Sequence, residues 1–407
     1  MGLVPRPLYT ERILPFMNKP LIKVITGVRR AGKSALIQLL IDHLTAGGVP
    51  AGNILNINME SLEFEALGDY RKLYDHVRRH LPGTTKSYLF VDEVQNVAEW
   101  ERAIASILAD GLADVTISGS NARLLSSDLA TRLTGRYVEI PVYPLLFSEF
   151  IRFQGVEPGS PDVHGAWTSF LRYGGFPGIH YLSLEDEPVF AYLNSLYHSI
   201  VLKDVVNRHE VREPAQLDGI TRFLFDNCGN ITTAKRMADY MKAQGLSVSL
   251  SRVQNYLSYL EEAFLVFRCR RYDLKGMRHL ELYDKFYMTD IGIRHGLVGY
   301  RDNDIAGLLE NVVYLELLAR GYTVSVGKFR DYEIDFVAER QTERLYVQVC
   351  YSLSDEKTVD REYRSLRRLP DNHPKLVLSL DTVQPANRDG IRWQNLGDFL
   401  LDDVKQK

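Results

Sequence analysis

Apolar and polar positions alternate along the first third of the chain in a way that predicts strands and helices in turn. Short apolar runs, typical of buried strands, are separated by longer segments with apolar residues at three- and four-residue spacing, typical of helices. The predicted strands are 21–25, 54–59, 88–91 and 115–118, and the predicted helices are 35–44, 70–81 and 100–108. This alternation predicts an α/β fold with a parallel sheet covered by helices on both faces.

The middle of the chain has a different pattern. Residues 144–212 read as helical and aromatic, with a Gly-Gly-Phe-Pro-Gly turn at 174–178. This segment is interpreted as a helical lid that relays movement, although a purely structural connector would show the same pattern. Helices are then predicted at 232–242 and 249–262, followed by extended runs at 264–272 and 281–288. Two helices at a short turn and a two-stranded wing are the pattern of a winged helix-turn-helix.

The last hundred residues again mix helices and strands. A helix is predicted at 305–320, and the elements after it are strands 323–326, 333–338 and 345–351, helix 355–369 and strand 376–380. This order resembles the core of restriction endonucleases. The predicted domains are therefore an ATPase domain at 1–145, a helical lid at 146–212, a winged helix at 213–290 and a nuclease-like domain at 291–407.

Composition adds limits to this picture. The 407 residues carry a formal net charge of −3, so any contact with nucleic acid needs a local basic patch. The three cysteines are far apart and lack C-x-x-C spacing, which favours a reducing compartment and argues against disulfides and zinc. No apolar run is long enough to cross a bilayer and residues 1–6 lack a signal-peptide core, so we expect a cytoplasmic protein without a membrane partner.

The strongest chemical signal is a complete G-x-x-x-x-G-K-[ST] motif at 27–34, between the first predicted strand and the first predicted helix. Such a loop directs backbone N–H groups and the helix N-terminus at nucleotide phosphates. Lys33 is expected to reach the β- and γ-phosphates, and Ser34 to bind Mg²⁺. The residues expected to surround the nucleotide are Gly27, Arg29, Arg30, Ala31, Gly32, Lys33, Ser34 and Ala35.

A second signal is the apolar strand 88–91, which ends in Asp92 and Glu93. Asp92 is predicted to hold Mg²⁺ through its water shell, and Glu93 to polarise the attacking water as a general base. One predicted strand, 54–59, lies between the two motifs in the sequence. The two motif strands are therefore not expected to be adjacent in the sheet. This arrangement, with Glu93, indicates the branch of phosphate-loop ATPases that has an additional catalytic acid.

Two further candidates lie downstream. Asn121 could orient the attacking water as a γ-phosphate sensor, although Ser120 or Asn121 could equally cap the next helix. Arg136, at the start of a predicted strand, is the first candidate for a finger inserted into a neighbouring subunit, and Arg132 is the second. A surface arginine in an ion pair is the competing interpretation. A finger of this kind implies a homo-oligomer.

The predicted winged helix carries the candidate DNA-binding residues. Ser251, Arg252, Asn255 and Ser258 would lie on the exposed side of the second helix, because Val253, Tyr256, Leu257 and Leu260 form its apolar face. On the wing, Arg268, Arg270, Arg271, Lys275 and Arg278 would reach phosphates of duplex or branched DNA. Winged helices also bind proteins, so a protein partner remains the alternative.

The nuclease-like tail has an incomplete catalytic motif. Asp335 matches the metal-binding Asp of the restriction-endonuclease core, and Glu310 is the acid on the preceding helix. Where an E-x-K motif is expected, the chain reads Gln348-Val349-Cys350. Cysteine does not supply the positive charge of the missing lysine, so we expect weak cleavage or none.

Taken together, these motifs resemble the prokaryotic AAA-type ATPases that carry a C-terminal domain of unknown function, DUF4143. The resemblance spans nearly the whole chain and includes the segments 27–34, 90–95, 118–121, 135–136, 144–150, 173–177, 256–261, 310–311 and 333–336. It implies an ATP- and Mg²⁺-dependent ATPase followed by a winged helix and a nuclease-like domain. It also implies that Arg6 and Tyr9 help to hold the nucleotide.

Overall fold

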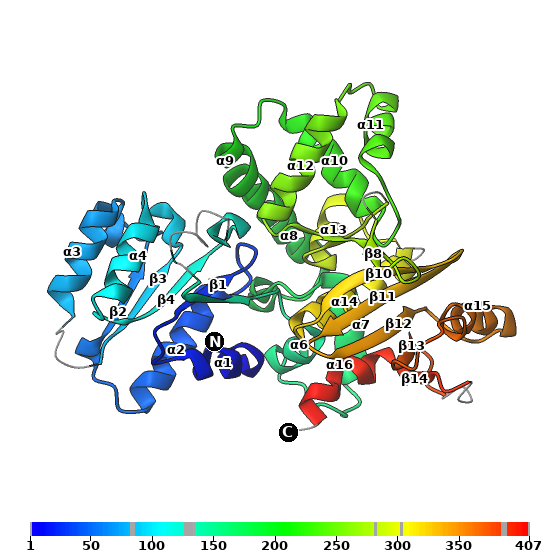
Figure 1. Ribbon diagram of the computed structural model, residues 1–407, viewed down its shortest axis with the longest axis horizontal. Coiled ribbons are helices and arrows are strands. Elements are labelled where there is room, and N and C mark those ends of the chain that lie inside the picture. Colours follow the sequence, from blue (N-terminus) through cyan, green and yellow to red (C-terminus); the bar gives the residue numbers. More distant parts are fainter. Residues whose placement is uncertain are drawn as a thin grey trace. The chain divides into compact units, whose positions relative to one another are not determined.

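The computed structural model describes residues 2–81, 86–125, 133, 135–280, 283–301, 304–383 and 389–405, and it divides into two compact units (Figure 1). The N-terminal unit comprises Met1–Val142 with the short segment Glu262–Phe264, and the C-terminal unit comprises Tyr143–Glu261 and Leu265–Lys407. Each unit is described separately below. The finer division into four domains remains a prediction.

The N-terminal unit is built on a five-stranded, wholly parallel sheet. Its strands, in spatial order, are β2 (Ile54–Asn58), β3 (Tyr88–Asp92), β4 (Asp114–Gly119), β1 (Ile22–Thr26) and β5 (Tyr137–Pro141). The predicted α/β class and parallel sheet are confirmed. Strand β4 lies between β1 and β3, as expected for motif strands that are not neighbours.

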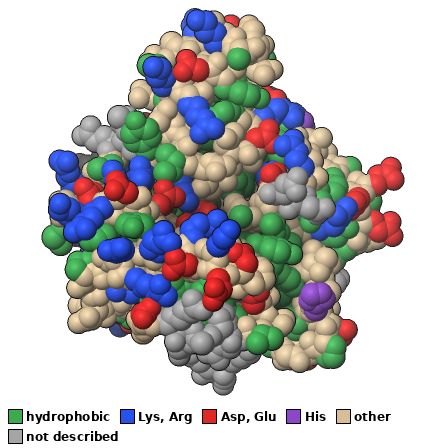
Figure 2. Space-filling model, turned by 90° about the vertical axis from the view of Figure 1, so that its right-hand side faces the viewer, with side chains coloured by type: hydrophobic (Ala, Val, Ile, Leu, Met, Phe, Trp, Pro, Cys, Tyr) green, Lys and Arg blue, Asp and Glu red, His purple; other side chains and the backbone are tan. Residues whose placement is uncertain are grey.

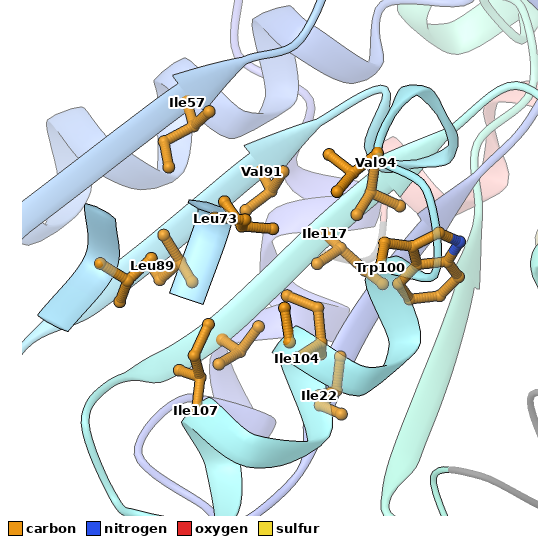
Figure 3. Packing of buried hydrophobic residues seen from close by; sticks show 14 of the residues in the cluster. Ile22, Ile57, Leu73, Leu89, Val91, Val94, Trp100, Ile104, Ile107 and Ile117 are labelled. Atoms are coloured by element: carbon orange, nitrogen blue, oxygen red, sulfur yellow. The ribbon is translucent and has the colours of Figure 1, made fainter. Parts of the chain in front are cut away.

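Helices cover both faces of this sheet. One face packs against α3 (Tyr70–His80) and α4 (Trp100–Ala109), and Figure 3 shows Leu73, Trp100 and Ile104 against the strand residues Leu89 and Ile117. The other face is covered by α2 (Lys33–Ala46), which α1 (Pro7–Ile13) contacts in turn. The short 3₁₀ segments are Leu14–Phe16, Ala51–Asn53, Leu62–Leu67, Val94–Asn96 and Ala122–Leu125.

The C-terminal unit begins with helices. They are α6 (Phe147–Phe153), α7 (Val163–Tyr173), a 3₁₀ segment (Pro177–Tyr181), α8 (Asp186–Ile200), a π-helical turn (Val201–Val206), α9 (Asn207–His209), α10 (Pro214–Asp226), α11 (Ala234–Ala243), α12 (Leu250–Glu262) and α13 (Ile291–Val298). Helix α13 packs against α7 and α8. The buried carboxylate of Asp290 caps α13 and also accepts a hydrogen bond from the Gly175 N–H, so it joins the 174–178 turn to this helix.

A mixed seven-stranded sheet forms the rest of the unit. Its spatial order is β14 (Arg392–Asn395), β13 (Lys375–Ser379), β12 (Glu343–Val349), β11 (Tyr332–Arg340), β10 (Thr323–Phe329), β7 (Arg271–Asp273) and β8 (Arg278–His279). It is accompanied by α14 (Ile305–Ala319), α15 (Glu356–Arg367) and α16 (Leu396–Lys405). All the elements predicted for the tail are present, whereas β14 and α16 were not predicted.

The two extended runs of the predicted wing pair only in part as expected. Strand β6 (Val266–Cys269) pairs antiparallel with β9 (Lys285–Met288), which confirms that the runs meet. The distal part of the hairpin departs from a free-standing wing, because β7 pairs with β10 and joins the seven-stranded sheet. Backbone groups of β7 are thereby paired with β10, and β7 and β8 extend the sheet beyond it.

Candidate functional site

The loop 27–34 leaves strand β1 and enters helix α2, as the motif predicts. Gly27 has φ 142° and Gly32 has φ 98°, backbone conformations that side chains other than glycine rarely adopt. A Cβ on Gly27 would lie 2.0 Å from the Val142 carbonyl oxygen, so this position accepts no side chain. The sequence thus builds a tight loop whose backbone leads directly into the positive end of a helix.

Lys33 holds this loop in shape. Its buried Nζ donates hydrogen bonds to the carbonyl oxygens of Gly27 (3.0 Å) and Val28 (3.1 Å). The same Nζ lies 3.8 Å from Oε1 of Glu93, so the two predicted catalytic motifs meet at the lysine. Ser34, at the start of α2, is exposed. The guanidinium of Arg29 forms an ion pair with Glu60 (2.6 Å). Arg30 is exposed in a left-handed conformation, with φ 67°.

The acids of the second motif lie at the carboxyl end of β3. Asp92 ends the strand and accepts a hydrogen bond from the Ser118 hydroxyl of neighbouring β4. Glu93 has φ 53°, an uncommon conformation that places its side chain where Gln95 and Ser120 can reach it. Gln95 Nε2 donates to Glu93 Oε2, and the Ser120 hydroxyl donates to the same oxygen at 3.2 Å. The carboxylate expected to act as a base is therefore held by two side chains.

Ser118, Ser120 and Gln95 are residues that sequence reasoning did not assign. Ser120 was considered only as a helix cap, and the signal for it is its position at the end of the strand beside β3. In parallel sheets, side chains at the carboxyl ends of adjacent strands converge. Asn121, the predicted sensor, is buried at this edge. Its role in orienting water remains a prediction.

Arg136 lies at the opposite end of the sheet from the phosphate loop. It immediately precedes β5, and the next residue, Tyr137, pairs with Ile22 at the start of β1, whereas the loop follows Thr26. At about 3.3 Å per residue, four residues of strand separate the two levels by roughly 13 Å. The exposed Arg136 is therefore far from its own phosphate loop. Arg132, the second candidate, lies outside the described residues.

Arg6 and Tyr9 lie at the start of α1, the helix that precedes the first strand. Arg6 is 2% exposed, its Nη1 donates to the Ala31 carbonyl oxygen at 2.7 Å, and its guanidinium stacks on the Tyr9 ring at 4.5 Å. Tyr9 is fully buried. The structure thus places Arg6 against the loop backbone and Tyr9 against Arg6, while direct contact of either with a nucleotide remains a prediction from the family resemblance.

The donor set at this edge fits ATP and Mg²⁺. The loop offers backbone N–H groups, a helix N-terminus and a lysine ammonium, which together suit phosphate oxygens. The hydroxyl of Ser34 and the carboxylate of Asp92 are the hard oxygen ligands that Mg²⁺ prefers. The parallel sheet order, the glycine loop and the acid pair together define a P-loop ATPase domain of the AAA class.

Comparison with known families agrees with this class. The family described as "AAA domain" matches residues 19–151, and a "Domain of unknown function (DUF8612)" matches residues 165–304. An uncharacterized protein of Haemophilus influenzae is 34% identical over 402 residues, covering 98% of this chain and 99% of that protein. The chain belongs to the same family as that protein, with an AAA domain followed by DUF8612.

The expected DUF4143 assignment is wrong, since the domain that matches the second part of the chain is DUF8612. A further relative, the uncharacterized protein MJ1544 of Methanocaldococcus jannaschii, is 29% identical over 362 residues, covering 85% of this chain and 78% of that protein. Family likeness therefore establishes an AAA ATPase domain and leaves the activity of the second part open.

Solved structures are more distant. The Walker-type ATPase PABY2304 of Pyrococcus abyssi is 14% identical, with a TM-score of 0.49, and covers 71% of this chain and 93% of that one. AMPPCP-bound DnaA of Aquifex aeolicus is 11% identical, with a TM-score of 0.27, and covers 62% of this chain and 85% of that one.

Within the described part of the chain, no helix is both long and apolar enough to cross a membrane.

The predicted DNA-binding residues divide into two groups. Arg252 and Asn255, with Ser251 and Ser258, lie on the exposed side of α12, opposite the buried Val253, Tyr256, Leu257 and Leu260. The wing residues are less available for phosphates. Arg268 is paired with Glu261 (2.7 Å), and Arg271 lies 3.8 Å from Glu333.

The remaining predicted wing residues, Arg270, Lys275 and Arg278, are exposed. On the face shown in Figure 2, Lys and Arg side chains alternate with Asp and Glu rather than forming one basic stripe. Some basic residues of the predicted wing, Arg268 and Arg271, therefore already form ion pairs within the protein. DNA binding by the wing remains a prediction.

The three predicted residues of the nuclease-like site lie near one another. Glu310 on α14 and Asp335 on β11 both approach the ammonium of Lys285, at 3.0 Å and 3.7 Å. Gln348 Oε1 accepts a hydrogen bond from the Asp335 N–H at 3.4 Å. Cys350, which stands at the position of the missing lysine, donates its thiol to the Leu378 carbonyl oxygen (3.7 Å). Burial raises the pKa of Asp335 well above its usual range, and nearby Glu310 raises it further.

Proposed function

We propose that the protein binds ATP with Mg²⁺ and hydrolyses it. The observation that supports this most directly is the meeting of Lys33 and Glu93 at 3.8 Å beside the Ser118-bound Asp92. Lys33 and the loop N–H groups would hold the phosphates, and Ser34 and Asp92 would bind Mg²⁺. The bound Mg²⁺ would neutralise charge on the phosphate oxygens. Glu93, oriented by Gln95 and Ser120, would take a proton from the attacking water.

Two substitutions separate binding from turnover. Lys33→Ala should weaken ATP binding at least tenfold, because it removes the charge that faces the phosphates. Glu93→Gln should bind ATP with nearly unchanged affinity and lower kcat by about a hundredfold or more, because only the base is lost. Calorimetric titration with a non-hydrolysable ATP analogue and a phosphate-release assay measure the two effects. Equal ATP affinity in wild type and Lys33→Ala would contradict the proposed role of the loop.

A second proposal is that the ATPase acts on DNA through helix α12. The supporting observation is the exposed polar side of α12, where Arg252 and Asn255 lie one turn apart on the face opposite the buried residues. An exposed helix with these side chains suits the major groove or a phosphate backbone. The competing proposal is that the same face binds a protein and that ATP switches this contact.

DNA titration distinguishes these proposals. Arg252→Glu should weaken duplex or junction binding at least fivefold at low salt and reduce any DNA stimulation of ATP hydrolysis. Lys357→Glu, an exposed charge reversal at the start of α15, is the matched control and should change neither. If wild-type hydrolysis and mobility are unaffected by duplex and junction DNA at low salt, the DNA proposal fails and the protein-binding alternative is favoured.

A further inference from the structure

A buried lysine lies at the centre of a carboxylate cluster in the C-terminal unit. Nζ of Lys285 is 3.0 Å from Glu310 Oε2, 3.1 Å from Glu333 Oε1 and 3.7 Å from Asp335 Oδ1. The lysine comes from β9, whereas the acids come from α14 and β11. Lys285 is only 3% exposed, so its ammonium depends on these carboxylates for its polar contacts.

Other side chains complete the cluster around the acids. The hydroxyl of Tyr287, two residues along β9 and on the same face of the strand, donates to Glu310 Oε2 at 2.8 Å. The Val349 N–H donates to Asp335 Oδ2 at 2.8 Å, and Arg271 lies 3.8 Å from Glu333 Oε2. These contacts hold each of the three acids in a defined position, unlike charged side chains that are free on a surface.

The charges of the cluster explain why a cation belongs there. Glu310, Glu333 and Asp335 bring three carboxylates together, and mutual repulsion in a buried place is costly without a positive charge. The ammonium of Lys285 lies within 4 Å of an oxygen of each of these three acids, so it offsets their mutual repulsion. Lys285 and Arg271 together supply two positive charges, the same charge that one divalent cation would bring.

The ammonium of Lys285 lies where the three carboxylates face one another. Carboxylates from a helix and a strand that converge on one point are the hard oxygen ligands that Mg²⁺ or Mn²⁺ would use. Here that point is already occupied by Nζ of Lys285. In the described ranges, no group of three or more His, Cys, Asp or Glu is arranged to hold a metal ion.

We propose that Lys285 is a built-in cation that fills the place of a divalent metal in the Glu310, Glu333 and Asp335 cluster. The cluster then needs no metal, and this part of the chain does not bind one in the wild type. Removing the ammonium while keeping the length of the side chain converts the cluster into a divalent-cation site. This proposal is independent of ATP hydrolysis and of DNA binding.

The test is metal binding by the full-length Lys285→Met variant without nucleotide. All proteins carry Asp92→Asn, which removes the predicted carboxylate ligand for Mg²⁺ at the end of β3. Mn²⁺ should bind Lys285→Met at one additional site, detected by electron paramagnetic resonance, and raise its Tm by about 5 °C at saturating concentration. Lys275→Met, an exposed lysine of the neighbouring hairpin, is the matched control and should behave as the wild type does.

Four outcomes decide the proposal. An additional Mn²⁺ site in Lys285→Met that disappears when Asp335→Asn is added supports it. A folded Lys285→Met variant without such a site overturns it. If Lys285→Met does not fold, the protein with wild-type Lys285 still gives the answer. A Mn²⁺ site in that protein that is lost on Asp335→Asn overturns the proposal, and the absence of any such site supports it.

Discussion

His180 is a partly buried imidazole among aromatic rings. It lies in the 3₁₀ segment after the 174–178 turn, with the rings of Phe150 and Phe153 at 4.8 Å and 5.4 Å between centroids. Burial lowers the pKa of His180 from 6.5 to about 4. The folded protein therefore keeps this imidazole neutral at pH values where the unfolded chain protonates it.

This difference predicts a loss of stability in acid. The contribution of His180 is complete above pH 6.5 and is lost as the pH falls towards 4, because only the unfolded state gains a proton in that range. His180→Gln should reduce the loss of unfolding free energy between pH 7 and pH 5 by about 1–2 kcal/mol. Urea unfolding at these pH values measures it. The exposed His164→Gln is the control, and an equal loss in wild type and His180→Gln would contradict the prediction.

The residues of the phosphate loop could be predicted from sequence because their chemistry is local. Gly27, Gly32 and Lys33 follow one another in a short segment whose backbone conformation depends on few neighbours. Ser118 and Ser120 could not be assigned in the same way. Their contacts with Asp92 and Glu93 depend on which strand lies beside β3, and a local sequence pattern does not reveal strand order.

At the scale of elements, Asp290 connects two segments far apart in the chain. Its carboxylate accepts hydrogen bonds from the N–H groups of Ile293 (3.0 Å), in the first turn of α13, and Gly175 (2.6 Å). Burial raises the pKa of Asp290 to about 6, and the backbone N–H bonds oppose this shift. A folded-state pKa above the unfolded one means that its contribution to stability falls as the pH rises from about 4 to 6.

Removal of this cap should destabilise the C-terminal unit. Asp290→Ala leaves the Gly175 and Ile293 N–H groups without their acceptor, which should cost about 2–4 kcal/mol of unfolding free energy. Asp162→Ala is the matched control, because Asp162 precedes α7 without a side-chain capping bond and should cost less than about 0.5 kcal/mol. Urea unfolding at pH 7.5 compares the two, and equal costs would show that Asp290 does not hold the turn.

The helices and strands themselves were largely predictable, since apolar spacing determines which segments can bury a face. The predicted helices 232–242 and 249–262 and most strands of the tail follow from such spacing. The short strands β7 and β8 differ. Two residues of β7 fall within the predicted extended run 264–272, whereas Arg278–His279 has no apolar pattern of its own. The pairing of β7 with β10, and of β8 with β7, is a tertiary effect that single-segment reasoning misses.

At the scale of the whole molecule, the position of Arg136 predicts an active oligomer. An arginine roughly 13 Å along the sheet from the level of its own loop can assist hydrolysis only in a neighbouring subunit. Arg136→Ala and Glu93→Gln should each be inactive alone, and an equal mixture should regain about a quarter of wild-type turnover. Recovery occurs because some interfaces then combine an intact Glu93 with an intact Arg136.

A second mixture controls this experiment. Glu93→Gln with Lys33→Ala should remain inactive, because both residues belong to the same subunit's half of the site. Phosphate release is measured over a range of protein concentrations together with mass in solution. Full activity of Arg136→Ala, or full activity of a strictly monomeric protein, would rule out the finger.

The pairing of β7 with β10 has a consequence for how this architecture can change in evolution. The strand Arg271–Asp273 lies before the predicted boundary at residue 290, and its partner Thr323–Phe329 lies after it. A recombination event that exchanged the segment before the boundary would remove one edge of the sheet and leave β10 open to self-association. The segments before and after residue 290 in the C-terminal unit are therefore expected to be inherited together.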